Sequence, residues 1–317
     1  MAMPNVSMTP TSILDCIGNT PLVLLRKIVP QGSARILLKL ESENPTGSLK
    51  DRMALAMIRA AEADGRLRPG GAVVEYTTGN AGTALSLVCA MTGHPLHIVT
   101  SDAYAQEKRD HMKILGAHVH VLTSDGGRMT EKLTRDMIET ARVLEGKTGA
   151  YWTNQLSNTD QIAGFHAMGE EIWTQTGGSV DCFVHAVGSA GCLRGNAEVL
   201  RRHNAKIRVV AVEPAESPVL SGGAPGAHKI DGMGAGFVVP LWRREAADQI
   251  ERVSTEEASA TTLRLAREEG LFGGPSTGAN VAAALRVAEQ LGPGATVVTA
   301  LCDTGMKYLH KFGAELD

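Results

Sequence analysis

Aromatic residues are scarce in this sequence: Phe, Trp and Tyr make up only 4% of the 317 residues. The core must therefore be built from Ala, Val, Leu, Ile and Met, and a hydrophobic content of 43% is ample for one large α/β domain or two domains. Blocks of like charge are also missing, since 31 basic and 34 acidic residues are interspersed and the net charge is −3. We therefore expect neither a nucleic-acid partner nor a membrane-surface partner.

Cysteine is also sparse, and its five copies form no Cys-x-x-Cys pair. An odd number without that spacing argues against a disulfide framework. Residues 1–10 contain no basic region followed by an apolar one, so the sequence predicts no signal peptide. No apolar run reaches the length of a membrane span. These absences together predict a cytoplasmic protein.

What the sequence does contain is a regular alternation of apolar strand patterns and amphipathic helix patterns. The predicted strands are Ile36–Leu40, Ala72–Tyr76, Leu96–Thr100, His118–Leu122, Asp181–Val187, Ile207–Glu213 and Ala295–Leu301. The predicted helices are Met53–Glu62, Asn80–Met91, Gln106–Leu115, Thr130–Leu144, Ile162–Gln175, Leu193–Arg202, Thr255–Glu269 and Ala279–Leu291. Such alternation is typical of parallel sheets covered by helices on both faces. Ligands then bind at the C-terminal edge of the strands.

The stretch Asn44–Arg52 joins the first of these strands to a helix. Ser48 is a good N-cap candidate, which places Lys50 in the first helical turn. The positive end of a helix dipole disfavours a cation there, and burial would lower the pKa of the amine further. A lysine that readily loses its proton can form a Schiff base with an aldehyde, whereas a solvated lysine would have no such role. We expect the neighbouring Asp51 and Arg52 to form structural pairs.

A second loop, Thr77-Thr78-Gly79-Asn80-Ala81-Gly82, follows a predicted strand and opens a helix. Free N–H groups at a helix start bind an anion such as a carboxylate. Glycine allows close approach of the backbone, and Asn80 offers both a donor and an acceptor. An ordinary N-cap turn is the alternative for this loop.

A third loop, Gly188-Ser189-Ala190-Gly191-Cys192-Leu193-Arg194-Gly195, has the same strand-to-helix position and suits a phosphate. It also permits a nicotinamide-dependent oxidoreductase, because the next strand ends in Glu213, where a Rossmann fold places its ribose-binding acid. The glycine spacing is not Gly-x-Gly-x-x-Gly, so a phosphate monoester fits better than a dinucleotide. Close packing of a helix on a strand remains the structural alternative.

A fourth loop, Gly273–Asn280, precedes the last long predicted helix. Ser276 or Thr277 either caps that helix or hydrogen-bonds a heteroaromatic ring nitrogen. A nucleophilic amine, a carboxylate loop, a phosphate loop and a neutral partner for a ring nitrogen are together what pyridoxal 5′-phosphate requires.

The histidines and acidic residues of the sequence do not indicate a metal site. His111, His118 and His120 come closest to a cluster, but no carboxylate or cysteine completes a site at ligand spacing. We therefore predict no metal, and we expect His185, in an apolar strand, to be a core residue. A weaker indication is that Asp303, which follows a predicted strand, supports Ser276.

With these motifs in order, the chain resembles the cysteine synthase (O-acetylserine sulfhydrylase) and cystathionine β-synthase family of fold-type II pyridoxal-phosphate enzymes. The likeness covers nearly the whole chain and includes Ile17–Leu22, the Lys50 stretch, the Asn80 loop, Gln155, the Gly188 loop, Val212–Pro214, His228–Phe237, Ser276 and Asp303–Gly305. It implies two three-layer α/β domains like those of tryptophan synthase β. The smaller, mobile domain would span residues 45–155, and the larger, cofactor-binding domain residues 1–44 plus 156–317. Family members are usually homodimers.

The resemblance also implies roles for individual residues. Lys50 would carry pyridoxal phosphate and act as the catalytic base, Asn80 would bond the ring 3-hydroxyl, and Ser276 would meet the ring nitrogen. The phosphate would be wrapped by Gly188, Ser189, Ala190, Gly191 and Cys192. The amino-acid substrate would be held by Thr77, Thr78, Gly79, Ala81, Gln155 and Gly232, the last within a flexible lip, Gly232–Gly236.

The sequence departs from cysteine synthases at four positions. Thr78 and Ala81 replace serine and threonine in the usual Thr-Ser-Gly-Asn-Thr-Gly loop, and Ala81 removes a hydroxyl donor while its N–H remains. Cys192 replaces the last threonine of the phosphate loop, and a thiol is only a weak donor. Leu156 stands where an aromatic residue is usual.

The resulting prediction is β-replacement on an activated serine, with O-acetylserine and sulfide giving L-cysteine and acetate. A hydroxyl at the ring nitrogen would favour prompt loss of the β-leaving group. The alternatives are a cystathionine β-synthase, another β-substituted alanine synthase such as one making diaminopropionate, the oxidoreductase above, and a non-catalytic cofactor-binding member. Intact Lys50, Asn80 and Ser276 argue against the last of these.

Overall fold

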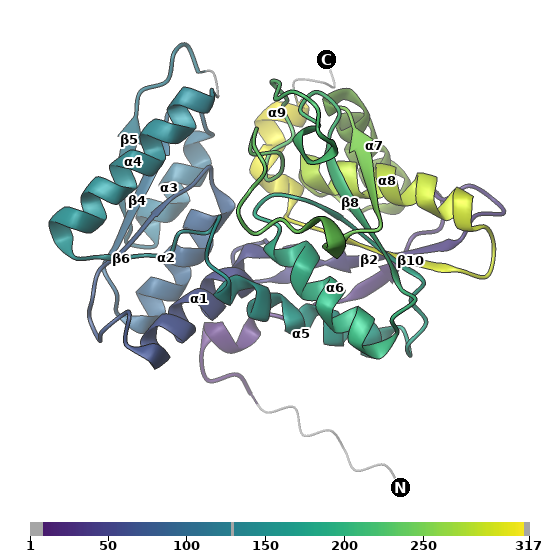
Figure 1. Cartoon of the computed structure of the whole chain (residues 1–317), viewed down its shortest axis with the longest axis horizontal. Helices are drawn as coiled ribbons and strands as arrows, with labels where there is room; N and C mark the ends of the chain where they lie inside the picture. Colours follow the sequence, from purple (N-terminus) through teal and green to yellow (C-terminus); the bar gives the residue numbers. More distant parts are fainter. Residues whose placement is uncertain (1–8, 128–129, 314–317) are drawn as a thin grey trace, which may run out of the picture.

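The computed structural model describes residues 9–127 and 130–313 and contains two sheets, each between layers of helices. Figure 1 shows the smaller sheet with its helices on the left and the larger sheet on the right. Residues 1–8 of the segment used to predict the absence of a signal peptide lie outside the described residues. Within the described part, no helix has both the length and the apolar character needed to cross a bilayer.

The larger sheet has six strands. Their order across the sheet is β1 (Leu22–Leu24), β2 (Arg35–Leu40), β10 (Thr296–Leu301), β7 (Cys182–Ala186), β8 (Arg208–Pro214) and β9 (Gln249–Val253). All neighbours pair in parallel except β1, which is antiparallel to β2. Leu22 lies opposite Lys39 in that pair. The predicted parallel α/β architecture is confirmed, with one short antiparallel edge strand that the sequence did not predict.

The smaller sheet has four parallel strands. Their order is β5 (His118–Leu122), β4 (Leu96–Ser101), β3 (Val73–Tyr76) and β6 (Tyr151–Trp152). Val74 and Val99 pack with residues of α4, whereas Val73 and Ile98 pack with residues of α2 and α3. Alternate residues of a strand thus enter different cores, as the twofold side-chain period requires.

The helices are α1 (Lys50–Asp64), α2 (Asn80–Thr92), α3 (Gln106–Ile114), α4 (Glu131–Thr148), α5 (Asp160–Gln175), α6 (Gly191–His203), α7 (Thr255–Glu269), α8 (Pro275–Leu291) and α9 (Leu309–Gly313). Most helices lie between strands along the chain, as the alternating pattern predicted, whereas α8 follows α7 directly and α9, which was not predicted, follows the last strand. Short 3-10 turns lie at Ile13–Cys16, Glu41–Glu43, Val219–Ser221, Arg244–Ala246 and Gly305–Tyr308. The larger sheet is sandwiched, because its two faces contribute to separate cores with α5 and α6 on one side and α7 and α8 on the other.

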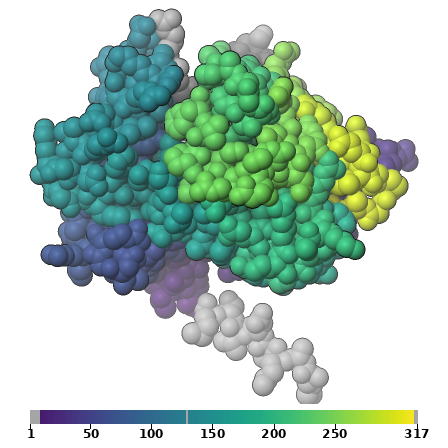
Figure 2. Space-filling model, in the orientation of Figure 1, coloured from purple at the N-terminus to yellow at the C-terminus, as the bar shows by residue number. Residues whose placement is uncertain are grey.

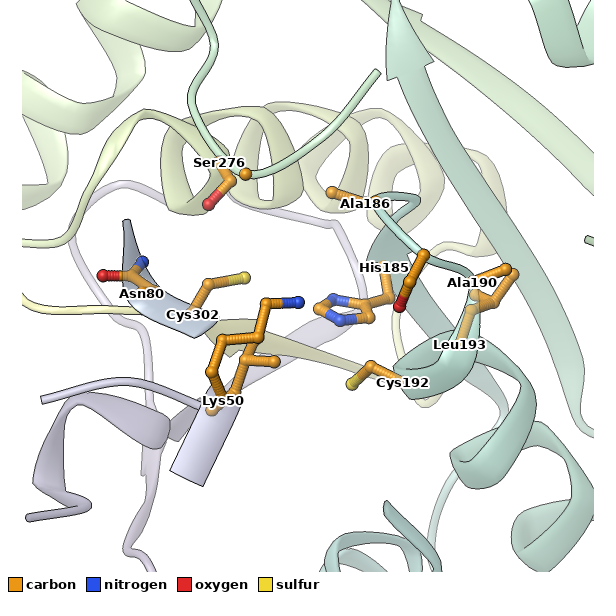
Figure 3. Close-up of a pocket in the computed structure, with 13 residues that line it drawn as sticks. Lys50, Asn80, His185, Ala186, Ala190, Cys192, Leu193, Ser276 and Cys302 are labelled. Carbon is orange, nitrogen blue, oxygen red and sulfur yellow. The ribbon is translucent and has the colours of Figure 1, made fainter. Parts of the chain in front are cut away.

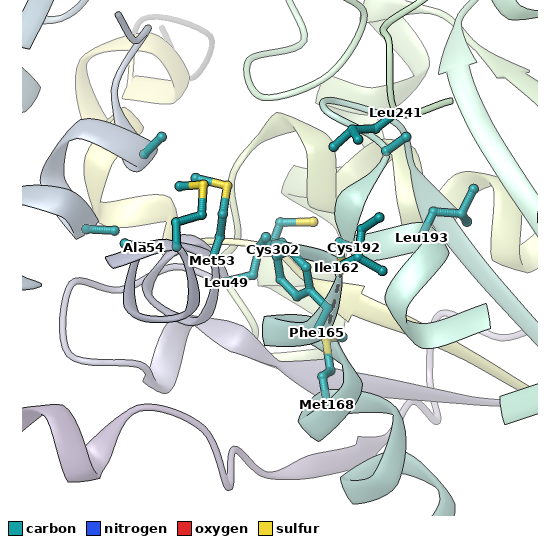
Figure 4. Close-up of a cluster of buried hydrophobic side chains, with 14 of the residues drawn as sticks. Leu49, Met53, Ala54, Ile162, Phe165, Met168, Cys192, Leu193, Leu241 and Cys302 are labelled. Carbon is teal, nitrogen blue, oxygen red and sulfur yellow. Dashed lines mark hydrogen bonds between the residues drawn. The ribbon is translucent and has the colours of Figure 1, made fainter. Parts of the chain in front are cut away.

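Helix α1 connects the two halves. Its apolar residues Met53 and Ala54 join a core that also contains Ile162, Phe165 and Met168 of α5 (Figure 4). The same core reaches Leu85 and Val88 of α2. Lys50, the first residue of α1, therefore stands between the two sheets.

His118 and His120 lie two residues apart on β5 and share one face of the smaller sheet. His97 of β4 lies beside both, with its Nδ1 atom 3.3 Å from Nε2 of His120. Among the described residues, no group of three or more His, Cys, Asp or Glu side chains is arranged to hold a metal ion.

Candidate active site

The segment before α1 is fastened to the C-terminal end of β10. Leu49 N–H donates to the Cys302 carbonyl at 2.9 Å, and Thr304 N–H donates to the Gly47 carbonyl at 3.0 Å. Ser48 Oγ accepts a hydrogen bond from Lys50 N–H at 3.3 Å, but the N-cap residue is Leu49, so the prediction of Ser48 as N-cap is wrong by one residue. Lys50 is in the first turn, as predicted.

The Lys50 side chain points into a pocket enclosed by loops from both halves of the chain (Figure 3). Its Nζ atom has no hydrogen-bond partner among the described residues, although His185, Cys192 and Cys302 line the same pocket. Burial lowers the pKa of Lys50, and the acidic groups of Cys192, Cys302 and Asp303 offset only part of that effect. A larger neutral fraction makes this amine a better nucleophile.

The Gly188 loop faces Lys50 across the pocket. Gly188, Ser189, Ala190, Cys192 and Leu193 line it, whereas Gly191 packs against the side chain of Gln161. Helix α6 begins at Gly191, so the first N–H groups of the helix have no acceptor within the helix. A Cβ atom on Gly188 would lie only 2.6 Å from the Gly232 carbonyl oxygen, so this close approach requires glycine.

Ser276 lies at the start of α8. This helix begins at Pro275 rather than at the predicted Ala279, and its N-cap is Gly274, so neither Ser276 nor Thr277 caps it. The proline at the first helical position explains the earlier start, because its fixed φ suits that position. The Ser276 hydroxyl lines the Lys50 pocket and hydrogen-bonds the Cys302 thiol, whose pKa is raised to about 12 by burial.

Asn80 starts α2 and also lines the pocket. Its Nδ2 donates to Asp303 Oδ2 at 2.7 Å, and its Oδ1 accepts from Lys307 Nζ at 2.8 Å. Asp303 Oδ2 also accepts from the Tyr308 hydroxyl at 2.7 Å. Asp303 therefore supports Asn80, with no hydrogen bond to Ser276 among the described residues.

A larger cavity of about 460 Å³ opens from the Lys50 pocket. Residues of the predicted substrate-binding set line it, namely Thr77, Thr78, Ala81, Gln155 and Gly232. Gly79 is the N-cap of α2, and its N–H donates to Thr77 Oγ1 at 3.0 Å. The predicted lip, residues 232–236, forms part of the wall, so the sequence motifs converge on one cavity.

Glu75 fixes the Gln155 segment to the end of β3. Its carboxylate accepts from Thr153 Oγ1 at 2.6 Å, Gln155 N–H at 2.9 Å and Trp152 Nε1 at 3.3 Å. Burial raises the pKa of Glu75 to about 7, although these donors favour the ionised form. No sequence motif pointed to Glu75, which lies inside an apolar strand.

One further residue of the pocket, His185, was not predicted from the sequence to belong to the site. His185 is buried, as expected for a core residue, but it also lines the pocket, and burial lowers its pKa to about 3. The Cys192 thiol is buried and its pKa is raised well above the usual value, which makes it a thiol rather than a thiolate. Glu213, the acid of the oxidoreductase alternative, accepts hydrogen bonds from Leu220 N–H at 2.7 Å and Ser221 N–H at 3.2 Å.

The pocket fits pyridoxal phosphate in three respects. Lys50 offers a partnerless amine for the aldehyde, the start of α6 offers N–H groups for the phosphate, and Ser276 offers a neutral hydroxyl for the ring nitrogen. The glycine at 188 leaves the backbone accessible where a side chain would collide.

Comparisons with known proteins agree with this geometry. A cysteine synthase of Staphylococcus aureus is 40% identical over 301 residues, which cover 94% of this chain and 95% of that protein. The crystal structure of cysteine synthase from Entamoeba histolytica superposes with a TM-score of 0.89 at 35% identity, covering 98% and 92% of the two chains. The crystal structure of an O-ureido-L-serine synthase gives a TM-score of 0.88 at 35% identity, with coverage of 96% and 95%.

The family profile described as pyridoxal-phosphate dependent enzyme matches residues 13–303, from the first 3-10 turn to the end of the site. That span contains the Lys50 pocket, the Gly188 loop and Ser276. The chain belongs to the family of pyridoxal-phosphate dependent enzymes.

Proposed function

We propose that this protein makes L-cysteine and acetate from O-acetylserine and sulfide, using pyridoxal 5′-phosphate. The observation that carries the proposal is the Lys50 amine, which has no hydrogen-bond partner in the described part of the chain and lies in a pocket with the Gly188 loop and Ser276. Cysteine synthases similar over nearly the full chain support the choice of this reaction within the family.

When bound, pyridoxal phosphate supplies the electron sink that stabilises negative charge at the substrate α-carbon. In the proposed mechanism, Lys50 would hold the cofactor, and the same amine would take the proton from the α-carbon of the substrate. The lowered pKa of Lys50 suits this role, because the amine must be unprotonated to accept that proton. Lys50 later returns the proton to the α-carbon of the product.

The loops around the pocket would bind different parts of the cofactor and the substrate. Gly188, Ser189, Ala190, Gly191 and Cys192 would hold the phosphate, while Asn80 and Ser276 would orient the ring. The N–H groups at the start of α2, with Thr77, Thr78, Gly79, Ala81 and Gln155, would bind the substrate carboxylate. Ser276 cannot keep a ring nitrogen protonated as an aspartate would, which favours loss of the β-leaving group.

A second candidate is β-replacement with a nucleophile larger than sulfide. Leu156 at the wall of the cavity replaces the aromatic residue that is usual in cysteine synthases, and its smaller side chain leaves more room there. The related O-ureido-L-serine synthase structure, named for a different β-substituted product, supports considering this candidate.

A substrate panel distinguishes the two candidates. The holoenzyme would be assayed with O-acetylserine, O-phosphoserine and serine, each with sulfide or homocysteine, and products would be identified by mass spectrometry. We expect O-acetylserine with sulfide to give the fastest turnover. Faster turnover with homocysteine as acceptor would replace the cysteine synthase assignment by the second candidate.

Three further proposals concern the whole protein. We propose a smaller, mobile domain at residues 45–155 and a larger domain at 1–44 plus 156–317, supported by the two separate sheets. We propose a homodimer, as is usual in the family. We also propose a cytoplasmic location, supported by five free cysteines, four of which are buried.

A further inference from the structure

Lys108 of α3 lies at the large cavity although no sequence motif pointed to it. Its side chain is only 6% exposed, and it lines the cavity with Thr77 and Thr78. A Cβ atom on Gly79 would be 2.6 Å from Lys108 Cδ and 3.5 Å from its Nζ. The lysine stem therefore crosses directly over Gly79, and the ammonium group lies beside the loop that begins α2.

The partner of Lys108 comes from the opposite wall of the cavity. Lys108 Nζ lies 2.9 Å from Asp231 Oδ2, and the ammonium also lies 4.4 Å from the centre of the Tyr308 ring. Burial alone would raise the pKa of Asp231, but Lys108 and more distant cations lower it, so this is an ion pair at neutral pH. Figure 2 shows the teal part of the chain abutting the green part.

This ion pair lies next to the loop at the start of α2, which is the predicted binding site of a carboxylate. Helix α2 begins at Asn80, so the N–H groups of Asn80 and Ala81 have no acceptor within the helix and suit a carboxylate. Ala81 contributes no hydroxyl of its own, and the three heavy atoms nearest to a Cβ placed on Gly79 all belong to the Lys108 side chain. A carboxylate bound at this helix start would compete with Asp231 for the Lys108 ammonium.

We propose that Lys108 is a specificity-determining residue that binds the α-carboxylate of the amino-acid substrate and exchanges Asp231 for it. This inference rests on the proposed function in one respect, namely that the ligand of the α2 loop is an amino-acid carboxylate. Asp231 is then a competitor that holds Lys108 in place before the substrate arrives. The exchange makes the cavity selective for amino acids with a free α-carboxylate.

The alternative is that the Lys108–Asp231 pair only ties α3 to the loop at residues 225–237. The two roles predict opposite effects of removing Asp231. If the pair is only a tie, Asp231→Asn weakens the wall of the cavity and lowers the affinity for ligands. If Lys108 exchanges partners, Asp231→Asn removes the competitor and raises the affinity for a carboxylate.

The experiment measures binding to the holoenzyme by calorimetry, with L-methionine and L-methioninamide as probes, because neither carries a leaving group on its β-carbon. We expect Lys108→Met to weaken L-methionine binding by about tenfold, the scale of one lost hydrogen bond to a charged group, with the amide unchanged. Asp231→Asn should strengthen L-methionine binding and leave the amide unchanged. Lys113→Met removes the same charge from the exposed side of α3 and should alter neither.

Equal weakening of acid and amide by Lys108→Met, or weaker acid binding in Asp231→Asn, would overturn the proposal. Should Lys108→Met not fold, as judged by circular dichroism, the Asp231→Asn result decides alone. The binding measurement does not depend on turnover. A holoenzyme that fails to use O-acetylserine would refute the proposed function. The comparison of L-methionine with L-methioninamide binding would still report on Lys108.

Discussion

Two lysines on either side of the same loop show how differently this protein treats an amine removed from water. Lys39 on β2 is fully buried, and its Nζ donates to the Thr20 carbonyl at 2.6 Å and to Gln175 Oε1 at 3.0 Å and lies 2.6 Å from Glu171. Lys50 at the start of α1 points into a pocket and has no such partner among the described residues. Burial lowers the pKa of both amines, but among the described residues a carboxylate lies within ion-pair distance of Lys39 and none does so for Lys50.

The surroundings of Lys39 form a closed network of charges. Arg52 lies 2.7 Å from Glu41 and 2.7 Å from Glu171, and the arginine and Glu41 are almost fully buried. Burial would raise the pKa of Glu171, but Arg52 and Lys39 lower it to about 2. The predicted structural pairing of Arg52 is thus present, while Asp51 is hydrogen-bonded to Thr46, whose N–H lies 2.7 Å away.

The comparison of Lys39 with Lys50 shows how a charged residue with a structural role can be distinguished from one with a functional role. A polar group without a partner is costly to keep away from water, so folded proteins pair such groups nearly everywhere. Lys50 is the exception in this region, and perturbed unpaired groups concentrate at functional sites. Four substitutions test this contrast, from the largest expected effect to the smallest.

Lys50→Ala should give the largest change, because no other amine takes its place in the pocket. We expect complete loss of the visible absorbance of lysine-bound cofactor and of cysteine formation, with the fold intact by circular dichroism. Borohydride reduction of the wild type followed by peptide mapping should place the label on Lys50. A label on Lys39 or Lys307 would contradict the assignment.

Arg52→Met should cost about 3–5 kcal/mol of unfolding free energy, because it leaves the carboxylates of Glu41 and Glu171 without their main partner. The measurement is urea unfolding at pH 7. Arg66→Met is the control, since Arg66 is 42% exposed and its pairs with Asp64 and Asp160 are worth at most about 1 kcal/mol. Similar losses in both variants would mean that the Arg52 network is not structural.

His185→Gln should change how stability depends on pH. The folded pKa of His185 is about 3, below its ordinary value of 6.5, so the unfolded chain binds the proton first and stability falls as pH drops below 6.5. The slope is about 1.4 kcal/mol per pH unit. Gln lacks this titration yet retains an acceptor for Asn280 Nδ2, which lies 3.2 Å from His185 Nδ1.

The quantity to follow is the difference in unfolding free energy between His185→Gln and the wild type at each pH. Glu75 changes the stability of both proteins in the opposite direction to His185, so the wild-type curve alone does not report on His185. The folded pKa of Glu75, about 7, exceeds 4.5, so Glu75 makes the protein more stable as pH falls through that interval. Unfolding by urea at several pH values between 4.5 and 7.5 gives both curves. Parallel curves for wild type and His185→Gln would show that His185 is not held neutral by the fold.

Lys39→Met should have the smallest effect, about 1–3 kcal/mol, because Glu171 retains Arg52 as its partner. We expect the absorbance of the bound cofactor to remain, in contrast to Lys50→Ala. Loss of cofactor binding in Lys39→Met would show that the two amines are not functionally separate.

The sequence predicted most of the regular elements closely. His118–Leu122 and Thr255–Glu269 match the structure, and Asn80–Met91 ends one residue early. The strands β1, β6 and β9 were missed because β1 has three residues, β6 has two, and β9 reads Gln-Ile-Glu-Arg-Val with only Val253 buried. Such short or polar edge segments carry little periodicity, and their pairing depends on neighbours far along the chain.

The residues of the candidate site also fall into two groups, those that were predicted from the sequence and those that only the structure revealed. Lys50, Asn80, the Gly188 loop and Ser276 come together because each follows a strand or opens a helix at one edge of a sheet, and local pattern is enough to place them there. The residues that surround them have no local signature. Asn80 meets Asp303 and Lys307 more than 200 positions later, and Lys108 meets Asp231 123 positions away.

The sequence by itself determined the order of strands and helices, the loops at their ends and the amine at position 50, because these follow from patterns a few residues long. Only the tertiary structure decided that Lys39 has partners whereas Lys50 has none within residues 9–127 and 130–313, that His185 and Cys302 line the pocket, and that Lys108 crosses Gly79. Those outcomes depend on which distant side chains share a small volume, and short-range periodicity does not encode such contacts.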